Sequence, residues 1–181
     1  MKTAFLGASL AAIVGSVATA DVTYSFTSQT WTGFNFTEAY TAGGLSGTLT
    51  GATVNATLNA SVNYTYADDL CVYVAGSPLA LGGALQCGGF SNLNATQRYS
   101  WANGASSAPG TTVTGTKNFT TGIDMTANPT LSVWIGNGYG AAGTSGTWTG
   151  SITLLGVTAV PAPGAIALVG LAGLVGRRRR S

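Results

Sequence analysis

The stretch VNATLNASVNYTY, residues 54–66, decides the fold class of this chain. Apolar and aromatic residues alternate here with Asn, Thr and Ser over thirteen positions. A period of two is that of a β-strand with one buried and one solvated face. We therefore expect an antiparallel strand whose inward side chains include Val62. The length of the stretch also predicts a bend or bulge that divides the strand between two pairing partners.

The rest of the chain body carries the same kind of pattern. Residues 70–75 (LCVYVA) are apolar on both faces, which favours an interior strand. Shorter segments bounded by Gly, Ser, Asn and Pro predict strands at 22–27, 32–40, 45–50, 97–101, 112–119, 131–135 and 147–155. Convincing helical periodicity is absent between residues 21 and 159. We expect an all-β domain over residues 21–159, a single two-sheet antiparallel β-sandwich. A jelly roll is favoured, with an immunoglobulin-like sandwich as the alternative.

Charged residues are scarce, which excludes several classes of function. They make up 7% of the chain, and His is absent. Residues 21–159 hold two cations, Arg98 and Lys117, and five anions, for a formal charge of −3. No basic patch is available to bind nucleic acid. The lack of His excludes Ser-His-Asp and Cys-His catalytic sites, and no phosphate-binding loop motif is present. We expect neither enzymatic activity nor a cofactor.

Residues 1–20 have the features of a signal peptide. Met1-Lys2 is a short charged segment, residues 4–17 are apolar and small, and Ala18-Thr19-Ala20 is a small-residue cleavage site. The pattern predicts Sec-type export, with cleavage by signal peptidase after Ala20. The alternative is a permanent N-terminal membrane helix.

Residues 160–181 form a three-part tail. Val160-Pro161-Ala162-Pro163 precedes an apolar run over residues 164–176, and Arg177, Arg178, Arg179 and Arg180 follow. As a helix, residues 160–176 would be about 25 Å long, near the minimum for crossing a bilayer. Because arginines stay on the cytoplasmic side, the body of the chain is expected to face outward.

This tail resembles the PEP-CTERM sorting signal of bacterial exported proteins. That signal combines a short Pro-Glu-Pro-like motif, one transmembrane stretch and a terminal basic cluster; here Ala162 stands where the family has Glu. The resemblance implies recognition by an exosortase-type membrane transpeptidase, with cleavage near the motif. It also implies transient anchoring in the membrane, followed by a location on the cell surface or in the extracellular matrix.

Cys71 and Cys87 are the two cysteines of the chain. An even number of cysteines in an exported protein favours a disulfide. The bond would close a loop and stabilise the domain by about 3 kcal/mol. A redox or metal pair is the alternative, although zinc usually needs four N or S ligands.

Asp68-Asp69 is the single pair of adjacent acidic residues. Together with Asn63, Asn92 or Asp124 it could supply hard oxygen ligands to Ca²⁺. The alternative is a turn that ends a strand, where Asp is common. Nothing in the spacing resembles a known calcium loop.

The aromatic residues suggest a surface on which sugars could stack. The set comprises Trp31, Trp101, Trp134, Trp148, Tyr73, Tyr99 and Tyr139. Aromatic residues in β proteins are more often part of the core, which is the alternative. Tyr139 is the best exposed candidate because it stands between two glycines in a loop. Trp134, Asp68 and Asp69 complete the candidate ligand-binding residues.

Two functional hypotheses follow from these observations. The first is an exported structural protein of the cell surface or extracellular matrix, routed by its C-terminal signal. It rests on the two terminal signals and the empty catalytic inventory. The alternative is a module that binds extracellular polysaccharide, assisted by calcium, and it rests on the aromatic residues and the acidic pair.

Overall fold

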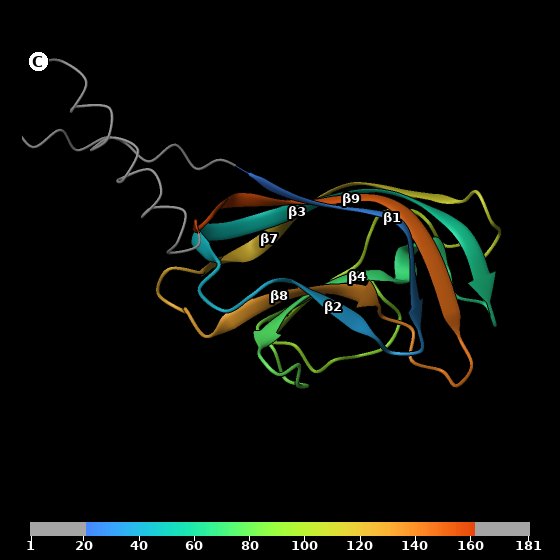
Figure 1. Ribbon diagram of the computed structural model, residues 1–181, viewed down its shortest axis with the longest axis horizontal. Coiled ribbons are helices and arrows are strands. Elements are labelled where there is room, and N and C mark those ends of the chain that lie inside the picture. Colours follow the sequence, from blue (N-terminus) through green and yellow to red (C-terminus); the bar gives the residue numbers. More distant parts are fainter. Residues whose placement is uncertain (1–20, 162–181) are drawn as a thin grey trace, which may run out of the picture.

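The computed structural model describes residues 21–161 as two β-sheets (Figure 1). The four-stranded sheet has the order β1 (Val22–Thr32), β9 (Ser145–Ala159), β3 (Leu45–Val62) and β7 (Thr112–Asp124). The five-stranded sheet has the order β2 (Phe36–Tyr40), β8 (Leu131–Asn137), β4 (Leu70–Gly76), β5 (Leu85–Cys87) and β6 (Gln97–Tyr99). Apart from the parallel pair β5–β6, neighbouring strands are antiparallel. The predicted all-β, two-sheet class is confirmed.

Helical structure is confined to one short segment of this region. A 3-10 turn, Ala67–Asp69, leads into β4. Within residues 21–161, no helix has the length and apolar character needed to cross a membrane. The proposed signal peptide with Ala18 and Ala20, and the tail from Ala162 and Pro163 to Arg177–Arg180, lie outside the described residues.

The main hydrophobic core lies between the two sheets, which face each other as two layers (Figure 1). Both sheets contribute inward side chains, and Trp148 is the largest that is fully buried. This core includes Phe26, Trp31, Leu49, Val54, Leu58, Val72, Val74, Leu85, Val133, Ile135, Trp148, Ile152 and Leu154.

The C-terminal part of the alternating stretch, residues 54–66, does not follow the inward and outward pattern that the alternation predicts. Val54 and Leu58 point into the core, as predicted. The pairing of β3 with β9 then shifts between Leu58 and Ala60, so β3 gains one residue there. An added residue inverts which side chains face inward. The predicted bulge is present, but it does not divide the strand between two partners, because β3 pairs with β9 on both sides of it. The predicted inward position of Val62 is wrong, because Val62 is 50% exposed.

The predicted disulfide between Cys71 and Cys87 is also wrong, because both residues are free thiols. The pairing of β4 with β5 places Val72, and not Cys71, opposite Cys87. Successive side chains of a strand point to opposite faces. Cys87 therefore lies in the main core, whereas Cys71 lies in a second cluster on the outer face of the five-stranded sheet. Burial raises the pKa of Cys87 to about 12 and that of Cys71 well above its ordinary value.

That second cluster packs beneath the chain segments between β4 and β6. Its buried members are Phe36, Cys71, Tyr73, Ala75 and Leu93. The Tyr73 hydroxyl donates to the carbonyl of Ala80 at 2.9 Å and accepts from the amide of Gly83 at 2.7 Å. One buried side chain thereby holds the β4–β5 loop against the sheet.

The strands give the molecule two distinct ends. At one end the last residue of β9, Ala159, pairs with Leu45, and the Val160 amide donates to the Gly44 carbonyl at 2.9 Å. At the other end the last residue of β3, Val62, pairs with Ser145. The loops after β3 and before β9 meet there, and we call it the loop end. Figure 1 shows that β1 starts and β9 finishes at the end opposite to it.

Candidate functional site

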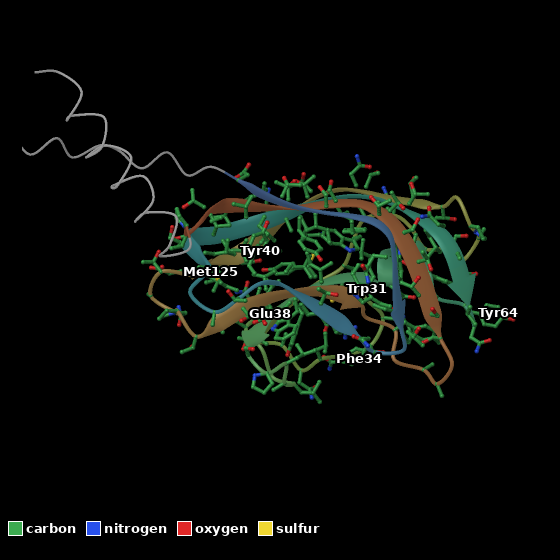
Figure 2. The ribbon with its side chains drawn as sticks, viewed as in Figure 1. Trp31, Phe34, Glu38, Tyr40, Tyr64 and Met125 are labelled. Carbon is green, nitrogen blue, oxygen red and sulfur yellow. The ribbon has the colours of Figure 1, made fainter. Side chains whose placement is uncertain are left out.

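Four aromatic side chains gather at the loop end. They come from three loops and are Tyr64, Tyr66, Phe90 and Tyr139, which we call the aromatic cluster. Tyr64 is 76% exposed and Phe90 is 75% exposed. The rings of Phe90 and Tyr139 pack edge to face, with their centroids 5.8 Å apart. Figure 2 shows Tyr64 at the tip of the molecule, beyond the end of β3. Large apolar groups left in water at one place are typical of a binding surface.

The backbone that presents Tyr64 has an unfavourable conformation. Asn63 and Tyr64 both have positive φ, 51° and 63°. Asn tolerates this region, but a bulky residue such as Tyr does so at a cost. The turn is held by a bond from Asn63 Nδ2 to the Gly143 carbonyl at 3.0 Å and by one from Thr65 Oγ1 to the Val62 carbonyl at 3.1 Å. Strain of this kind at an exposed aromatic points to a functional position.

The buried side chain of Asp69 hydrogen-bonds to two of the three loops. One carboxylate oxygen accepts the Tyr66 amide at 2.7 Å, and the other accepts the Phe90 amide at 3.1 Å. The side chain is buried, and burial raises the pKa of Asp69 to about 6 despite these two donors. The carboxylate thus fixes the backbone beside two members of the aromatic cluster.

Gln86, at the middle of β5, shapes the loop that carries Phe90. Its side chain is fully buried. Oε1 accepts the Leu93 amide at 3.0 Å, while Nε2 donates to the carbonyls of Gly88 at 3.1 Å and Ser91 at 2.8 Å. Three hydrogen bonds from one rigid strand leave this loop little freedom.

Two glycines bring the loop before β9 against the loop after β5. A Cβ atom on Gly138 would lie 2.7 Å from the Cα of Gly89, so this contact requires glycine. The Ser91 amide donates to the Gly138 carbonyl at 2.8 Å, and the Gly140 amide donates to Ser91 Oγ at 3.0 Å. These contacts place Tyr139 beside Phe90.

Two adjoining hollows open around the aromatic cluster. The aromatic hollow, about 210 Å³, is lined by Tyr64, Tyr66, Asp69, Phe90 and Tyr139. The polar hollow, about 240 Å³, shares Tyr66, Asp69 and Phe90. Its other lining residues are Asp68, Gly88, Gly89, Arg98, Ser100 and Trp101. Apolar walls with a few fixed polar groups are typical of small-molecule sites.

The structure brings together three of the four candidate residues. Tyr139, Asp68 and Asp69 all lie at the loop end and line one or both hollows. The prediction that Tyr139 is the best exposed aromatic is wrong, because Tyr139 is half-buried whereas Tyr64 and Phe90 are about three quarters exposed. Trp134 does not line either of them, since it sits on β8 between Glu38 and Tyr73 in the sheet. The other three tryptophans, Trp31, Trp101 and Trp148, are buried in the main core and form no sugar-stacking surface.

One of the calcium ligands considered from the sequence, Asp124, lies far from the acidic pair. Asp124 lies near the opposite end, where it pairs with Thr48 and accepts the Ala127 amide at 2.9 Å. Both oxygens of Asp69 already accept backbone amides. Between residues 21 and 161, no three His, Cys, Asp or Glu side chains lie close enough to hold a metal ion. The acidic pair instead serves the turn and the loops around it.

Sequence reasoning missed Tyr64, Tyr66, Phe90 and Arg98 as site residues. Tyr64 and Tyr66 continue the alternation of β3, which predicts that they face the core as part of that strand. Phe90 stands between Gly89 and Ser91, so the reasoning that singled out the glycine-flanked Tyr139 applies to it as well. Arg98 carried no signal beyond being one of the two cations of the body.

The chain matches no protein-family model, no curated protein and no solved structure. The geometry of the loop end is therefore the basis for assigning a function.

Proposed function

We propose that the protein is an exported β-sandwich that binds an extracellular polysaccharide through the aromatic cluster. One observation carries this proposal: Tyr64 and Phe90 each expose about three quarters of their surface on loops fixed by buried Asp69 and Gln86. Aromatic rings stack on the apolar faces of sugars, and their hydroxyls bind the polar edges. A preformed surface loses little conformational entropy on binding.

We also propose a jelly-roll arrangement of the sandwich. The chain passes from one sheet to the other at the β1–β2, β2–β3, β3–β4, β6–β7, β7–β8 and β8–β9 connections. An immunoglobulin fold places its first two strands side by side in one sheet, which differs from this order. Jelly rolls are an architecture of lectin domains, so the arrangement suits a sugar-binding role by fold analogy.

The position of the site agrees with the routing inferred from the two termini. In the proposal, the chain is exported by the Sec-type machinery, cut by signal peptidase, and held at its C-terminus until an exosortase-type transpeptidase acts on the tail. Ala159 and the start of β1 lie at the end opposite to the aromatic cluster (Figure 1). A chain held by its tail would therefore direct the cluster away from the membrane, toward surface or matrix polymers.

A structural role in the extracellular matrix is the second candidate. It is favoured by the outer face of the four-stranded sheet, which presents rows of uncharged side chains. One row runs across all four strands through Thr23, Thr153, Thr53 and Thr116. Within this row, hydroxyl groups hydrogen-bond in pairs, Thr23 with Thr153 at 2.8 Å and Thr53 with Thr116 at 2.8 Å. Such a face keeps a surface protein hydrated without charge.

A binding measurement decides between the two candidates. The purified protein is screened on a glycan array, and the best ligand is titrated by calorimetry. We expect the Phe90→Ala variant to bind at least tenfold more weakly with an unchanged melting temperature, because Phe90 supports little of the fold. The Thr53→Ala variant is the matched control and should bind as the wild type does. Absence of binding to every glycan would refute the sugar-binding function and leave the structural role.

A further inference from the structure

Three ionisable side chains, Asp68, Asp69 and Arg98, line the polar hollow beside the aromatic cluster. Arg98 Nη2 donates to the Phe90 carbonyl at 2.8 Å, the one side-chain hydrogen bond of Arg98 within residues 21–161. Within the same residues, the Asp68 carboxylate accepts no hydrogen bond from another side chain. Both residues line the hollow.

The pKa of Asp68 agrees with this separation. Burial raises the pKa of Asp68, and Arg98 does not lower it, as a close partner would. Arg98 likewise does not lower the pKa of Asp69, which Asp68 raises further. The hollow therefore offers an acceptor and a donor that remain available to a ligand.

We propose that the polar hollow is a second sugar subsite that takes a vicinal diol of an uncharged sugar, with Asp68 accepting from one hydroxyl and Arg98 donating to its neighbour. This inference rests on the proposed function. A sugar hydroxyl both donates and accepts, so two adjacent hydroxyls satisfy a carboxylate and a guanidinium at once. Hydrogen bonds to ionised groups are about twice as strong as neutral ones.

The two hollows fit one continuous ligand. They share Tyr66, Asp69 and Phe90 as common walls. A sugar stacked in the aromatic hollow would thus place its linked neighbour in the polar hollow. The site is matched to a polymer rather than to a single monosaccharide.

The charge of the polar hollow sets the class of polysaccharide. Two carboxyl groups, of Asp68 and Asp69, and one guanidinium, of Arg98, line the hollow. A uronic acid would gain from Arg98 but would meet both carboxylates in a partly desolvated hollow. We therefore assign the site to neutral polysaccharides and expect polyuronates to be excluded.

The test uses the purified protein and four hexasaccharide probes titrated by calorimetry. The neutral probes are maltohexaose, cellohexaose and mannohexaose, and the acidic probe is hexagalacturonate. We expect the wild type to bind at least one neutral probe and to bind hexagalacturonate at least tenfold more weakly. The Asp68→Ala variant should bind the neutral probe about tenfold more weakly, the loss expected for a hydrogen bond to a charged group.

Two further variants separate binding from folding. Arg98→Gln should weaken neutral binding, and Arg98→Lys should restore part of it, because the charge remains. Arg98 also bonds to the Phe90 carbonyl, so Arg98→Gln could unfold the loop. In that case Asp68→Ala decides the test, because its melting temperature should match that of the wild type.

Each contrary result has a distinct meaning. If Asp68→Ala binds within twofold of the wild type while Phe90→Ala is weakened, the second subsite is refuted and the aromatic site stands. If the wild type binds hexagalacturonate as tightly as the neutral probes, the neutral class is refuted. If the wild type binds none of the four probes, the second subsite is refuted; failure on the full glycan array would also refute the proposed function.

Discussion

The outer face of the four-stranded sheet and the loop end differ in which kind of residue they expose. On the sheet face, polar side chains are exposed and satisfy one another, as Thr23 does with Thr153 at 2.8 Å. At the loop end, aromatic rings are exposed, while polar Asp69 and Gln86 are buried beneath them.

This difference indicates which surface gains from a partner. Hydroxyls that already bond to each other and to water gain little from contact with another molecule. Exposed rings gain free energy when they are covered, at roughly 25 cal/mol per Å² of apolar surface. Because the loops beneath the rings are already held in place, binding costs little conformational entropy to offset that gain.

The largest expected effect distinguishes inward from outward positions of β3. Leu58→Asp should prevent folding, because an unpaired carboxylate in the core costs more than about 4 kcal/mol. Val62→Asp, four residues on, should change the free energy of unfolding by less than about 0.5 kcal/mol, since Val62 is half exposed. Circular dichroism and urea unfolding measure both. Comparable losses in the two variants would mean that the register after Leu58 is different.

The next effect concerns the polar support of the loop end. Asp69→Ala should lower the free energy of unfolding by about 2–3 kcal/mol, because two backbone amides lose a charged acceptor. Asp68→Ala is the matched control on the neighbouring residue and should cost less than about 0.5 kcal/mol. Urea unfolding at pH 7 gives both values. An equally mild effect of Asp69→Ala would show that the loops do not depend on this carboxylate.

A smaller effect should appear in the dependence of stability on pH. The pKa of Asp69 is about 6 in the folded protein, above its ordinary 3.8. Between these values the folded state binds more protons than the unfolded state, so stability should rise as the pH falls from 7 toward 4. The raised pKa of Asp68 acts in the same direction. In Asp69→Asn the slope of melting temperature against pH should become flatter; an unchanged slope would assign it to other groups.

No effect at all is expected from a reducing agent. Cys71 and Cys87 are free thiols on opposite faces of one sheet. Dithiothreitol should leave both the mass and the melting temperature unchanged. A thiol reagent should find no reactive cysteine in the native protein and two after unfolding. A mass 2 Da lower before reduction would show a disulfide and contradict the register of β4 and β5.

The sequence predicted the fold class well because alternation is a local signal. Most strands were located from it, but β5 was missed because Leu85–Cys87 is too short to show a period. The errors at Val62 and at the cysteines have a common cause. A single inserted residue, or a shift of one position between two strands, reverses which face a side chain occupies. Neither can be read from one strand alone.

The candidate site was predicted only in part because it is assembled from three loops. Tyr139 and the acidic pair were found from local context, as a glycine-flanked aromatic and a turn signal. Tyr64 was hidden because it continues the alternation of β3, and only the left-handed backbone at Asn63 and Tyr64 takes it out of the strand. The meeting of Phe90 with Tyr139 depends on close packing of Gly89 against Gly138, a contact between distant segments.

The Tyr64→Gly variant tests the central claim, that the aromatic cluster is built for binding and not for stability. Glycine accepts the positive φ of 63° without strain. The free energy of unfolding should therefore stay the same or rise by up to about 1 kcal/mol, and the melting temperature should not fall. Calorimetric titration with the neutral hexasaccharide that the wild type binds best should show at least a tenfold loss of affinity. Unchanged affinity, or a loss of affinity that appears only together with a lower melting temperature, would contradict the account.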